Sequence, residues 1–365
     1  MLKLKGGYAF KSEKFQDSGV PVVRISNLPQ NSYSVDLSDC VYYECGNYQN
    51  YTVKNGDLLI AMSGATTGKT AIYRYDYPAY LNQRVGLFAP KELVHNQFLY
   101  PIVESKTFIS QLGSKLVAGA QPNISSQDIE TIAVGLPSKE EQIKIAHLFE
   151  LLNQKIETQS KIIEELTTLR SALTEKCSRQ AGTLFSLADI LEETDERSTV
   201  VNQYQVLSST VKGIFSQKEY FNKDIASEDN KGYKVVRRGN VVLSPQNLWM
   251  GNINYNNRFD VGIVSPSYKI YSIKKGFNPT FIAALLKTKK ALYEYMLASE
   301  QGASVVRRNL NVEAFMGITF RIPNAYQQEV LSKAIAAIDS KLSNELAIFE
   351  QLQLQKGSLL ENMFI

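Results

Sequence analysis

Two long segments of the chain show a heptad spacing of apolar residues. Between Ser138 and about Ser178, apolar side chains recur alternately every four and every three residues, and the same spacing returns close to the C-terminus. The spacing predicts two long helices, the first about 60 Å in length at 1.5 Å per residue. We expect them to pair as an antiparallel coiled coil; the alternative is that each packs on its own domain as ordinary core. The predicted seam consists of Ile145, Phe149, Leu152, Ile156, Gln159, Ile163, Leu166 and Leu173 in the first helix and of Leu331, Ile335, Ile338, Leu342, Glu345, Phe349, Leu352 and Leu359 in the second.

Polar residues interrupt both seams at equivalent places. Gln159 and Glu345 occupy the midpoints, and Arg170 and Lys356 each replace a further apolar residue. In an antiparallel pair the midpoints should approach within about one helical turn, 5.4 Å along the axis. Such a polar layer fixes the register of a coiled coil at some cost in stability.

Each long helix has a capping sequence at its start. Ser138 is followed three residues later by Glu141, and Asn324 is followed in the same way by Gln327. Both pairs come directly after a proline, which ends a preceding strand. The helices should therefore begin at these two places.

An internal repeat extends beyond the helices. The stretch 123–137 (NISSQDIETIAVGLP) matches 309–323 (NLNVEAFMGITFRIP), and further upstream, at a slightly smaller offset, 53–59 matches 236–242. The matching stretches lie much further apart than the roughly 20 to 50 residues of a solenoid unit, so they indicate a duplicated domain. The second copy carries an additional segment, 184–204, ahead of its first motif, so we expect the first copy to be shorter at its N-terminus.

The regions between the helices have the pattern of short strands. Alternating runs such as 22–25, 57–60 and 268–271 are bounded by turn residues, and helical periodicity returns near 98–112 and 281–297. The predicted class is α+β, with two pseudo-symmetric mixed α/β domains separated by two long helices. The expected division is a first domain at 1–137, a central helix at 138–180, a second domain at 181–323 and a C-terminal helix at 324–365.

Composition is compatible with this organisation. The chain has 365 residues, of which 44% are hydrophobic and 21% charged, which is typical of a globular protein with two domains. The formal charge of +4 is compatible with nucleic-acid binding and equally with a basic enzyme. No apolar run is long enough for a bilayer span, and the N-terminus does not resemble a signal peptide, so we expect a cytoplasmic protein. Three scattered cysteines and two histidines disfavour a zinc site, and we expect no bound metal.

Two sequences resemble cofactor motifs without matching them. The stretch 64–70 (GATTGKT) looks like a phosphate-binding loop, but only three residues separate its glycines where the loop requires four. Asn278-Pro279-Thr280-Phe281 and Ser265-Pro266-Ser267-Tyr268 are similar to the Asn-Pro-Pro-aromatic loop of amino-methyltransferases but lack the second proline. No nucleophile or metal motif accompanies the histidines, so the sequence predicts no catalytic residues in this chain.

The order of several motifs resembles one family, the DNA-specificity subunit of Type I restriction-modification enzymes. The resemblance spans nearly the whole chain. The motifs are Gly7 to Ser12 (GYAFKS) with Phe15, Pro21 to Leu28 (PVVRISNL), Asn55 to Leu59 running into the turn at 64–69, Leu81 to Arg84 (LNQR), Gln121 to Ser125 (QPNIS), and Leu136-Pro137 followed by Glu141-Gln142 and Ile145-Ala146. In the second copy, 262–268 (GIVSPSY) is similar to another form of the family's recognition domain.

The resemblance implies a non-catalytic subunit that reads DNA. Two target recognition domains would each read one half of a bipartite sequence in double-stranded DNA. Two helices would form an antiparallel coiled coil that sets the spacer and docks the methyltransferase subunits, expected to number two, and the restriction subunits. S-adenosylmethionine for adenine methylation, and ATP and magnesium for cleavage, would be bound by those partners and not by this chain.

Candidate DNA-contacting residues are the polar side chains of the loops in both copies. Arg and Lys pair with guanine, Asn and Gln with adenine, and Ser and Thr position phosphates. Asparagines in such loops also serve as turn residues, and arginines also lie on solvated faces. The candidates are Arg24, Ser26, Asn27, Lys69, Asn82, Gln83, Arg84, Gln121 and Asn123 in the first copy and Gln246, Asn247, Trp249, Asn252, Ser267, Tyr268, Arg307, Arg308 and Asn309 in the second.

Two other hypotheses remain open on the sequence. The rival is a self-contained nucleic-acid methyltransferase, or a nucleotide-dependent enzyme using the turn at 64–70. A duplicated protein-interaction adaptor without a role on DNA is the third. The lack of a complete cofactor loop favours the DNA-reading subunit over the enzyme.

Overall fold

A computed structural model of the chain describes residues 2–29, 32–116, 123–221, 229–301 and 308–364. It divides into two compact units, each of which combines a globular part with portions of both long helices. Unit 1 contains Met1–Ile162 and Glu345–Ile365, and unit 2 contains Ile163–Asn344. The mixture of strands and helices in both units confirms the predicted α+β class.

Unit 1 is built on two four-stranded sheets. The first is antiparallel and has the order β1-β8-β5-β6, and the second has the order β3-β2-β7-β4 with β2 and β7 parallel. The strands are β1 (Leu2–Gly6), β2 (Val20–Val23), β3 (Val41–Tyr43), β4 (Thr52–Val53), β5 (Leu58–Ala61), β6 (Thr70–Ile72), β7 (Ala79–Leu81) and β8 (Val85–Pro90). The helical elements are η1 (Ser12–Lys14), η2 (Ile25–Asn27), η3 (Gln49–Tyr51), η4 (Asn96–Phe98), α1 (Leu99–Glu104), α2 (Lys106–Leu116) and α3 (Ser126–Glu130).

Unit 2 repeats the first of these sheets. The sheet β10-β17-β14-β15 has the connectivity of β1-β8-β5-β6, as the sequence repeat requires. Further two-stranded pairs are β11 with β12, β13 with β16, β18 with β19, and β9 with β20. The strands are β9 (Thr183–Ser186), β10 (Leu191–Thr194), β11 (Leu207–Thr210), β12 (Gly213–Ser216), β13 (Lys234–Arg237), β14 (Asn240–Leu243), β15 (Ile253–Tyr255), β16 (Val261–Val264), β17 (Lys269–Ile273), β18 (Ser299–Gln301), β19 (Arg308–Leu310) and β20 (Thr319–Ile322). The helical elements are α5 (Leu187–Ile190), α6 (Gln217–Phe221), η5 (Pro245–Met250), α7 (Pro279–Leu285), α8 (Lys289–Leu297) and α9 (Val312–Met316).

The helices predicted near the end of each globular part are present, and each is broken at an equivalent residue. Ser105 separates α1 from α2 and its hydroxyl accepts from the Phe108 amide at 3.2 Å. Thr288, its counterpart in the second copy, caps α8 in the same way on the Ala291 amide at 3.2 Å. A side chain that replaces a helical hydrogen bond favours the start of a new helix, which explains both breaks.

The two long helices are α4 (Lys139–Ser178) and α10 (Ala325–Met363). The capping box at Ser138 is formed: its amide and hydroxyl both donate to the Glu141 carboxylate, at 3.0 and 2.9 Å. Asn324 accepts from the Gln327 amide at 2.9 Å and so caps α10. Both predicted starts are confirmed.

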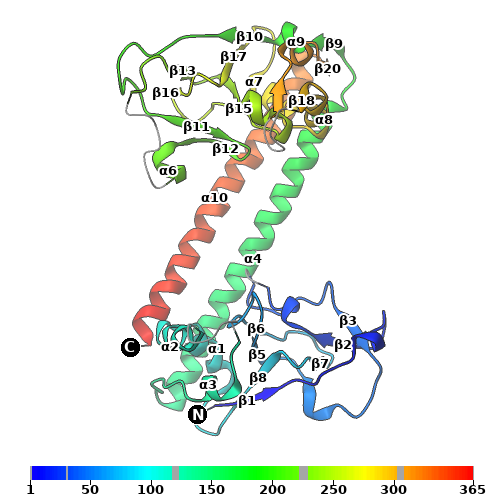
Figure 1. The fold of residues 1–365 in the computed structure, drawn as a ribbon, viewed down its shortest axis with the longest axis vertical. Coiled ribbons are helices and arrows are strands. Elements are labelled where there is room, and N and C mark those ends of the chain that lie inside the picture. The colour runs from blue at the N-terminus through cyan, green and yellow to red at the C-terminus, as the bar shows by residue number, and fades with distance from the viewer. Residues whose placement is uncertain (1, 30–31, 117–122, 222–228, 302–307, 365) are drawn as a thin grey trace. The chain divides into compact units, whose positions relative to one another are not determined.

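In each unit the corresponding parts of α4 and α10 lie side by side and run antiparallel (Figure 1). In unit 1, Phe149 contacts Phe364 with ring centroids 6.2 Å apart, and Gln159 contacts Glu345. In unit 2, Arg170 forms an ion pair with Asp339. All sixteen predicted seam positions are buried or half-buried. The prediction of paired helices is therefore confirmed, and separate packing of each helix on its own domain is excluded.

A buried glutamine joins each long helix to its globular part with the same hydrogen bonds. Gln142 accepts from the His95 amide at 2.8 Å and donates to the Pro137 carbonyl at 3.0 Å. Gln328, the equivalent residue of the second copy, accepts from the Asn278 amide and donates to the preceding proline carbonyl, both at 2.9 Å. The duplication thus preserves the joint between helix and domain.

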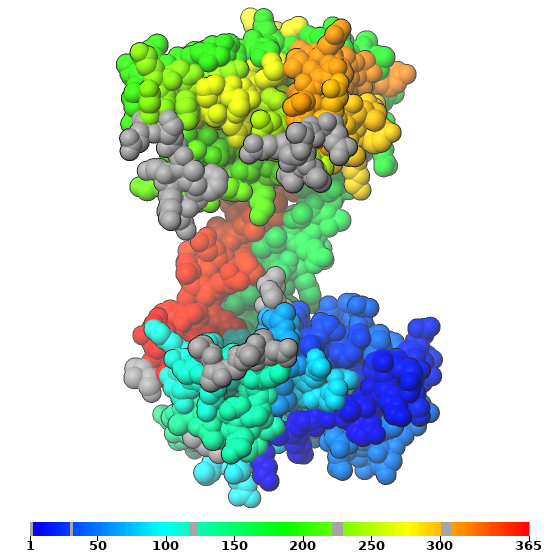
Figure 2. Space-filling model, viewed as in Figure 1, coloured from blue at the N-terminus to red at the C-terminus, as the bar shows by residue number. Residues whose placement is uncertain are grey.

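The C-terminal end of α10 completes the core of unit 1. Phe364 stacks on Phe98 with centroids 5.8 Å apart, and Thr107 donates to its carbonyl at 3.1 Å. The space-filling view shows this end of α10, in red, against the cyan surface of the α1–α2 region (Figure 2). Unit 1 is therefore assembled from segments at both ends of the chain.

Candidate nucleic-acid interface

Three segments that are distant in the sequence meet beside the first sheet of unit 1. Met62, just after β5, donates its amide to the Arg84 carbonyl and accepts from the Ile124 amide, both at 2.9 Å. Ser63 and Asn123 form an isolated antiparallel bridge next to these bonds. The backbone therefore brings the turn at 62–69, the loop at 82–84 and the segment at 123–124 together.

A fourth segment fixes the loop at 82–84 from the other side. The Tyr8 amide donates to the Leu81 carbonyl at 2.8 Å, and the Gln83 amide donates to the Tyr8 carbonyl at 2.9 Å. Gly7 permits this approach, since a Cβ at that position would lie 2.1 Å from the carbonyl oxygen of Asn82. The Gly-Tyr motif at 7–8 thus has a steric function in building the site.

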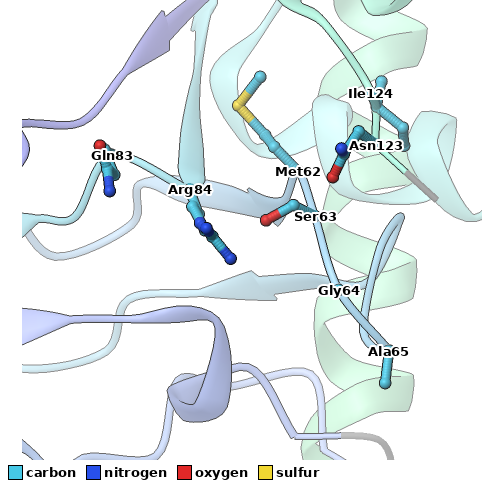
Figure 3. Close-up of a pocket in the computed structure, with 8 residues that line it drawn as sticks. All are labelled: Met62, Ser63, Gly64, Ala65, Gln83, Arg84, Asn123 and Ile124. Carbon is cyan, nitrogen blue, oxygen red and sulfur yellow. The ribbon is translucent and has the colours of Figure 1, made fainter. Parts of the chain in front are cut away.

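The converging segments enclose an open hollow of about 620 Å³ (Figure 3). Three predicted DNA-contacting side chains line it, namely those of Gln83, Arg84 and Asn123, and all three are exposed. The Ser63 hydroxyl points towards Arg84 and has no hydrogen-bond partner among the described residues. The hollow therefore presents a guanidinium and two amides, which are groups that pair with base edges and phosphates.

The glycine-rich stretch at 64–70 is a hairpin turn. The Thr67 amide donates to the Gly64 carbonyl at 3.1 Å and the Gly68 amide donates to the Ala61 carbonyl at 2.8 Å. Both glycines have positive φ, and the chain continues directly into strand β6. A phosphate-binding loop leads into a helix whose N-terminus holds the phosphates, so this stretch does not have that structure.

The remaining candidates of unit 1 lie in the same region with different exposures. Ser26 is exposed in η2, whose Ile25 lies 3.3 Å from the position of a Cβ on Gly64. Asn82 and Lys69 are half-buried, and the Lys69 ammonium has no hydrogen-bond partner in the described part of the chain. Gln121 lies outside the described residues.

In unit 2 the element η5 occupies the place of the hairpin turn. Its C-cap Gly251 has φ 86°, and the equivalent glycine of unit 1, Gly68, has φ 87°. Strand β19 packs against η5, and the Arg308 guanidinium lies over the Trp249 ring at 4.6 Å from its centroid. Five candidates share this region: Gln246 and Asn309 are exposed, and Asn247, Trp249 and Arg308 are half-buried.

Two of the candidate asparagines are buried and form hydrogen bonds within the protein instead of facing solvent. Asn27 is 2% exposed, accepts from the Arg24 amide and donates to the Asp36 carbonyl, both at 2.9 Å. Asn252 is 4% exposed and exchanges hydrogen bonds with Ser209, donating to its carbonyl at 3.0 Å and accepting from its hydroxyl at 2.9 Å. Both asparagines are therefore buried with internal hydrogen-bond partners, as buried polar groups generally are.

Three further candidates have contacts of their own. Arg24 donates from Nη2 to the Asp39 carbonyl at 3.4 Å. Tyr268 donates to the Ser209 carbonyl at 3.2 Å, and burial raises the pKa of its hydroxyl. Ser267 is exposed and its hydroxyl lies 3.1 Å from that of Ser265. Arg307 lies outside the described residues.

Two residues of this region were missed as candidates. Ser63 lies in the turn at 62–69, and its proximity to Arg84 depends on hydrogen bonds between distant segments. Tyr8 is 39% exposed and its ring contacts Tyr48 and Tyr51 at centroid distances of 5.2 Å. Tyr8 could have been predicted as a candidate because it lies in the GYAFKS motif.

Other chemistry is limited in the described part of the chain. Within the described ranges no group of three or more His, Cys, Asp or Glu side chains is arranged to hold a metal ion. Of the helices that the structure describes, none combines the length and apolarity needed to cross a membrane.

Comparison with known proteins finds similarity to one family. Residues 1–168 match the family described as the Type I restriction modification DNA specificity domain. The MjaVIII specificity subunit of Methanocaldococcus jannaschii is 28% identical over 172 residues, covering 46% of this chain and 40% of that protein. The EcoAI specificity subunit of Escherichia coli is 31% identical over 155 residues, covering 40% of this chain and 26% of that protein. The chain thus spans less than half the length of these relatives.

The fold agrees over the full chain. The Type I restriction-modification S subunit from M. genitalium superposes with a TM-score of 0.63 at 14% identity, covering 100% of this chain and 94% of the other. This likeness shows that the chain shares the fold of that S subunit.

Proposed function

We propose that this chain is the sequence-specific DNA-recognition subunit of a Type I restriction-modification complex. Each unit reads one half of a bipartite target in double-stranded DNA. The observation that carries the proposal is the convergence of Gln83, Arg84 and Asn123 on one hollow, with a turn of equivalent position in unit 2. Base readout needs several donors and acceptors held close together, and this arrangement supplies them.

The paired helices act as the scaffold in this proposal. They set the spacer between the half-sites and dock two methyltransferase subunits and the restriction subunits. Those partners bind S-adenosylmethionine, ATP and magnesium, so that the complex methylates adenine and cleaves DNA in the cytoplasm. This chain contributes sequence selection and binds none of these cofactors.

The test is to map methylated adenines in cells that express the chain with its partner subunits. The wild-type complex should methylate one bipartite sequence. Combined Arg84→Ala and Asn123→Ala substitutions should relax one half of that sequence and leave the other half unchanged, because each unit reads separately. A lost bidentate base contact costs about 1 to 3 kcal/mol.

A matched control removes a charge of unit 1 outside the hollow. Lys91 is exposed, and Lys91→Ala should leave both halves unchanged. Equal relaxation of both halves by the hollow variant would contradict separate reading. Binding of labelled S-adenosylmethionine by the purified chain alone would favour a self-contained methyltransferase instead.

A further inference from the structure

Arg308 and Trp249 form a pair in unit 2 that the packing of two elements holds together. Arg308 begins strand β19, which pairs with β18 and packs against η5. Trp249 belongs to η5, which is anchored by the fully buried Leu248 and ends at Gly251 in the left-handed region. The Arg308 guanidinium lies over the indole ring with Cζ 4.6 Å from its centroid. Attraction between a cation and an aromatic face restricts where this guanidinium can turn.

Within the described ranges of the chain, the Arg308 side chain contacts the indole ring of Trp249. Its N–H groups donate no hydrogen bond to any residue in those ranges. Other arginines of unit 2 differ in this respect. Arg237 holds the Glu196 carboxylate at 2.7 Å and Arg258 holds that of Glu219 at 2.8 Å. The Arg308 donors therefore remain available to a ligand.

A guanidinium held over an aromatic ring is suited to a ligand with two adjacent acceptors. A guanidinium lying over a ring leaves the N–H groups at its edge to form two parallel hydrogen bonds. In the major groove, guanine offers two adjacent acceptors, O6 and N7, and arginine pairs with them bidentately. A phosphate can be approached from many directions and does not require the plane of the guanidinium to be held. The neighbouring exposed amides of Gln246 and Asn309 are also side chains of the base-reading type.

We infer that Arg308, held over Trp249, reads a guanine in the half-site of unit 2. The inference rests on the proposed function and adds the identity of one base to it. By the repeat, Arg308 corresponds to Pro122 of unit 1, so unit 1 has no arginine at this position. The guanine contact therefore belongs to one half of the target.

The experiment maps methylated sites for the full complex with variants of this chain. For the wild type, one half of the target should contain an invariant G·C pair. Arg308→Ala should reduce the preference for guanine at that position by about 5- to 150-fold, with the other half-site unchanged. Arg308→Gln should shift the preference there towards adenine, since glutamine pairs bidentately with adenine.

Substitutions of the ring test the role of stacking. Trp249→Phe keeps an aromatic face and should retain most of the guanine preference, whereas Trp249→Leu should lower it at the same position. Lys275→Ala removes an exposed positive charge of unit 2 and should change no position. The unchanged half-site reports in every variant that the complex is folded and assembled.

Two results would overturn the inference. One is uniform loss of methylation on all sequences by Arg308→Ala with full recovery by Arg308→Lys, which would assign the residue to a phosphate. The other is an Arg308→Ala complex that keeps every position of the target. If the wild-type complex itself selects no sequence, the proposed function fails, which is a different outcome from either of these.

Discussion

Gln159 of α4 donates from Nε2 to the backbone carbonyl of Glu345 in α10 at 2.9 Å, and it also contacts the Glu345 carboxylate. The two residues are 8% and 5% exposed. Gln159 and Glu345 are equivalent positions of the repeat, so each residue meets its own counterpart. This is the contact expected when two copies of a repeated helix pair antiparallel at their midpoints. It confirms the predicted approach of the two seam midpoints.

Replacing only one of these two polar residues should lower the stability of the protein. Gln159→Ala leaves the Glu345 carboxylate buried without that donor, and we expect the free energy of unfolding to fall by about 1 to 3 kcal/mol. Replacing both residues by leucine should restore most of that loss, because an apolar layer needs no partner. Urea unfolding of the three proteins measures the difference. Glu350→Ala, at an exposed position of α10, is the control and should change little.

The steric role of Gly7 gives a prediction with a neighbouring control. Gly7→Ala would place a methyl group 2.1 Å from the Asn82 carbonyl oxygen, so the loop at 82–84 must move. We expect selectivity for the half-site of unit 1 to fall, while that of unit 2 is kept. The Cβ of a Gly6→Ala variant would meet nothing within 4 Å, so this variant should behave like the wild type. Methylated-site mapping for both variants provides the measurement, and equal behaviour of the two would contradict the steric argument.

Whether the length of the two helices sets the spacer between the DNA half-sites can be tested by lengthening them. Inserting one heptad into α4 and one into α10, at matched layers beside Gln159 and Glu345, keeps the seam in phase and adds about 10 Å at 1.5 Å per residue. At 3.4 Å per base pair, the spacer should grow by roughly three base pairs. Three base pairs also rotate the second half-site by nearly a third of a turn, so affinity should fall unless the DNA or the coil twists.

The half-site sequences themselves should stay the same in the insertion variant, since no recognition loop is changed. Sequencing of methylated sites reads both the spacer and the half-sites. An active complex with the original spacer would show that the helices do not set the distance.

The cysteines should differ in their reaction with a thiol reagent. Cys45 is exposed, whereas Cys177 is fully buried in the core of unit 2, and burial raises the pKa of its thiol to about 11. At pH 8 the Cys177 thiol is almost entirely protonated, and the thiolate is the reactive form. Cys45 should therefore react first, and Cys177 only as unit 2 unfolds. Mass spectrometry of the labelled peptides over time, with and without urea, measures both rates; rapid labelling of native Cys177 would contradict its burial.

The long helices and their pairing could be predicted from the sequence because their determinants are local and periodic. A heptad seam depends on spacings of three and four residues, and the cap at Ser138 depends on a partner three residues away. The constant offset of the repeat then identifies the second helix, and the matching breaks at Gln159 and Glu345 predict their contact. The strands of the globular parts could be predicted for the same reason, because the alternation of apolar and polar residues is also a local pattern.

The candidate site was only partly predictable. Residue type alone placed Asn27, Asn82, Asn123 and Asn252 in one group, although Asn27 and Asn252 are buried with internal partners and Asn123 lines the hollow. The difference depends on which backbone groups and side chains lie within hydrogen-bond distance after folding.

The sequence by itself determined the helices, their seam and the duplication of the domain. The tertiary structure decided which polar residues meet. Met62 joins Arg84 to Ile124 through backbone bonds, and β19 places Arg308 over Trp249. Both juxtapositions depend on hydrogen bonds and packing between segments that are distant in the sequence, and backbone bonds of this kind are made by N–H and C=O groups that every non-proline residue carries. These contacts between distant segments leave no pattern of residue types in the sequence. They could therefore be identified only from the folded structure.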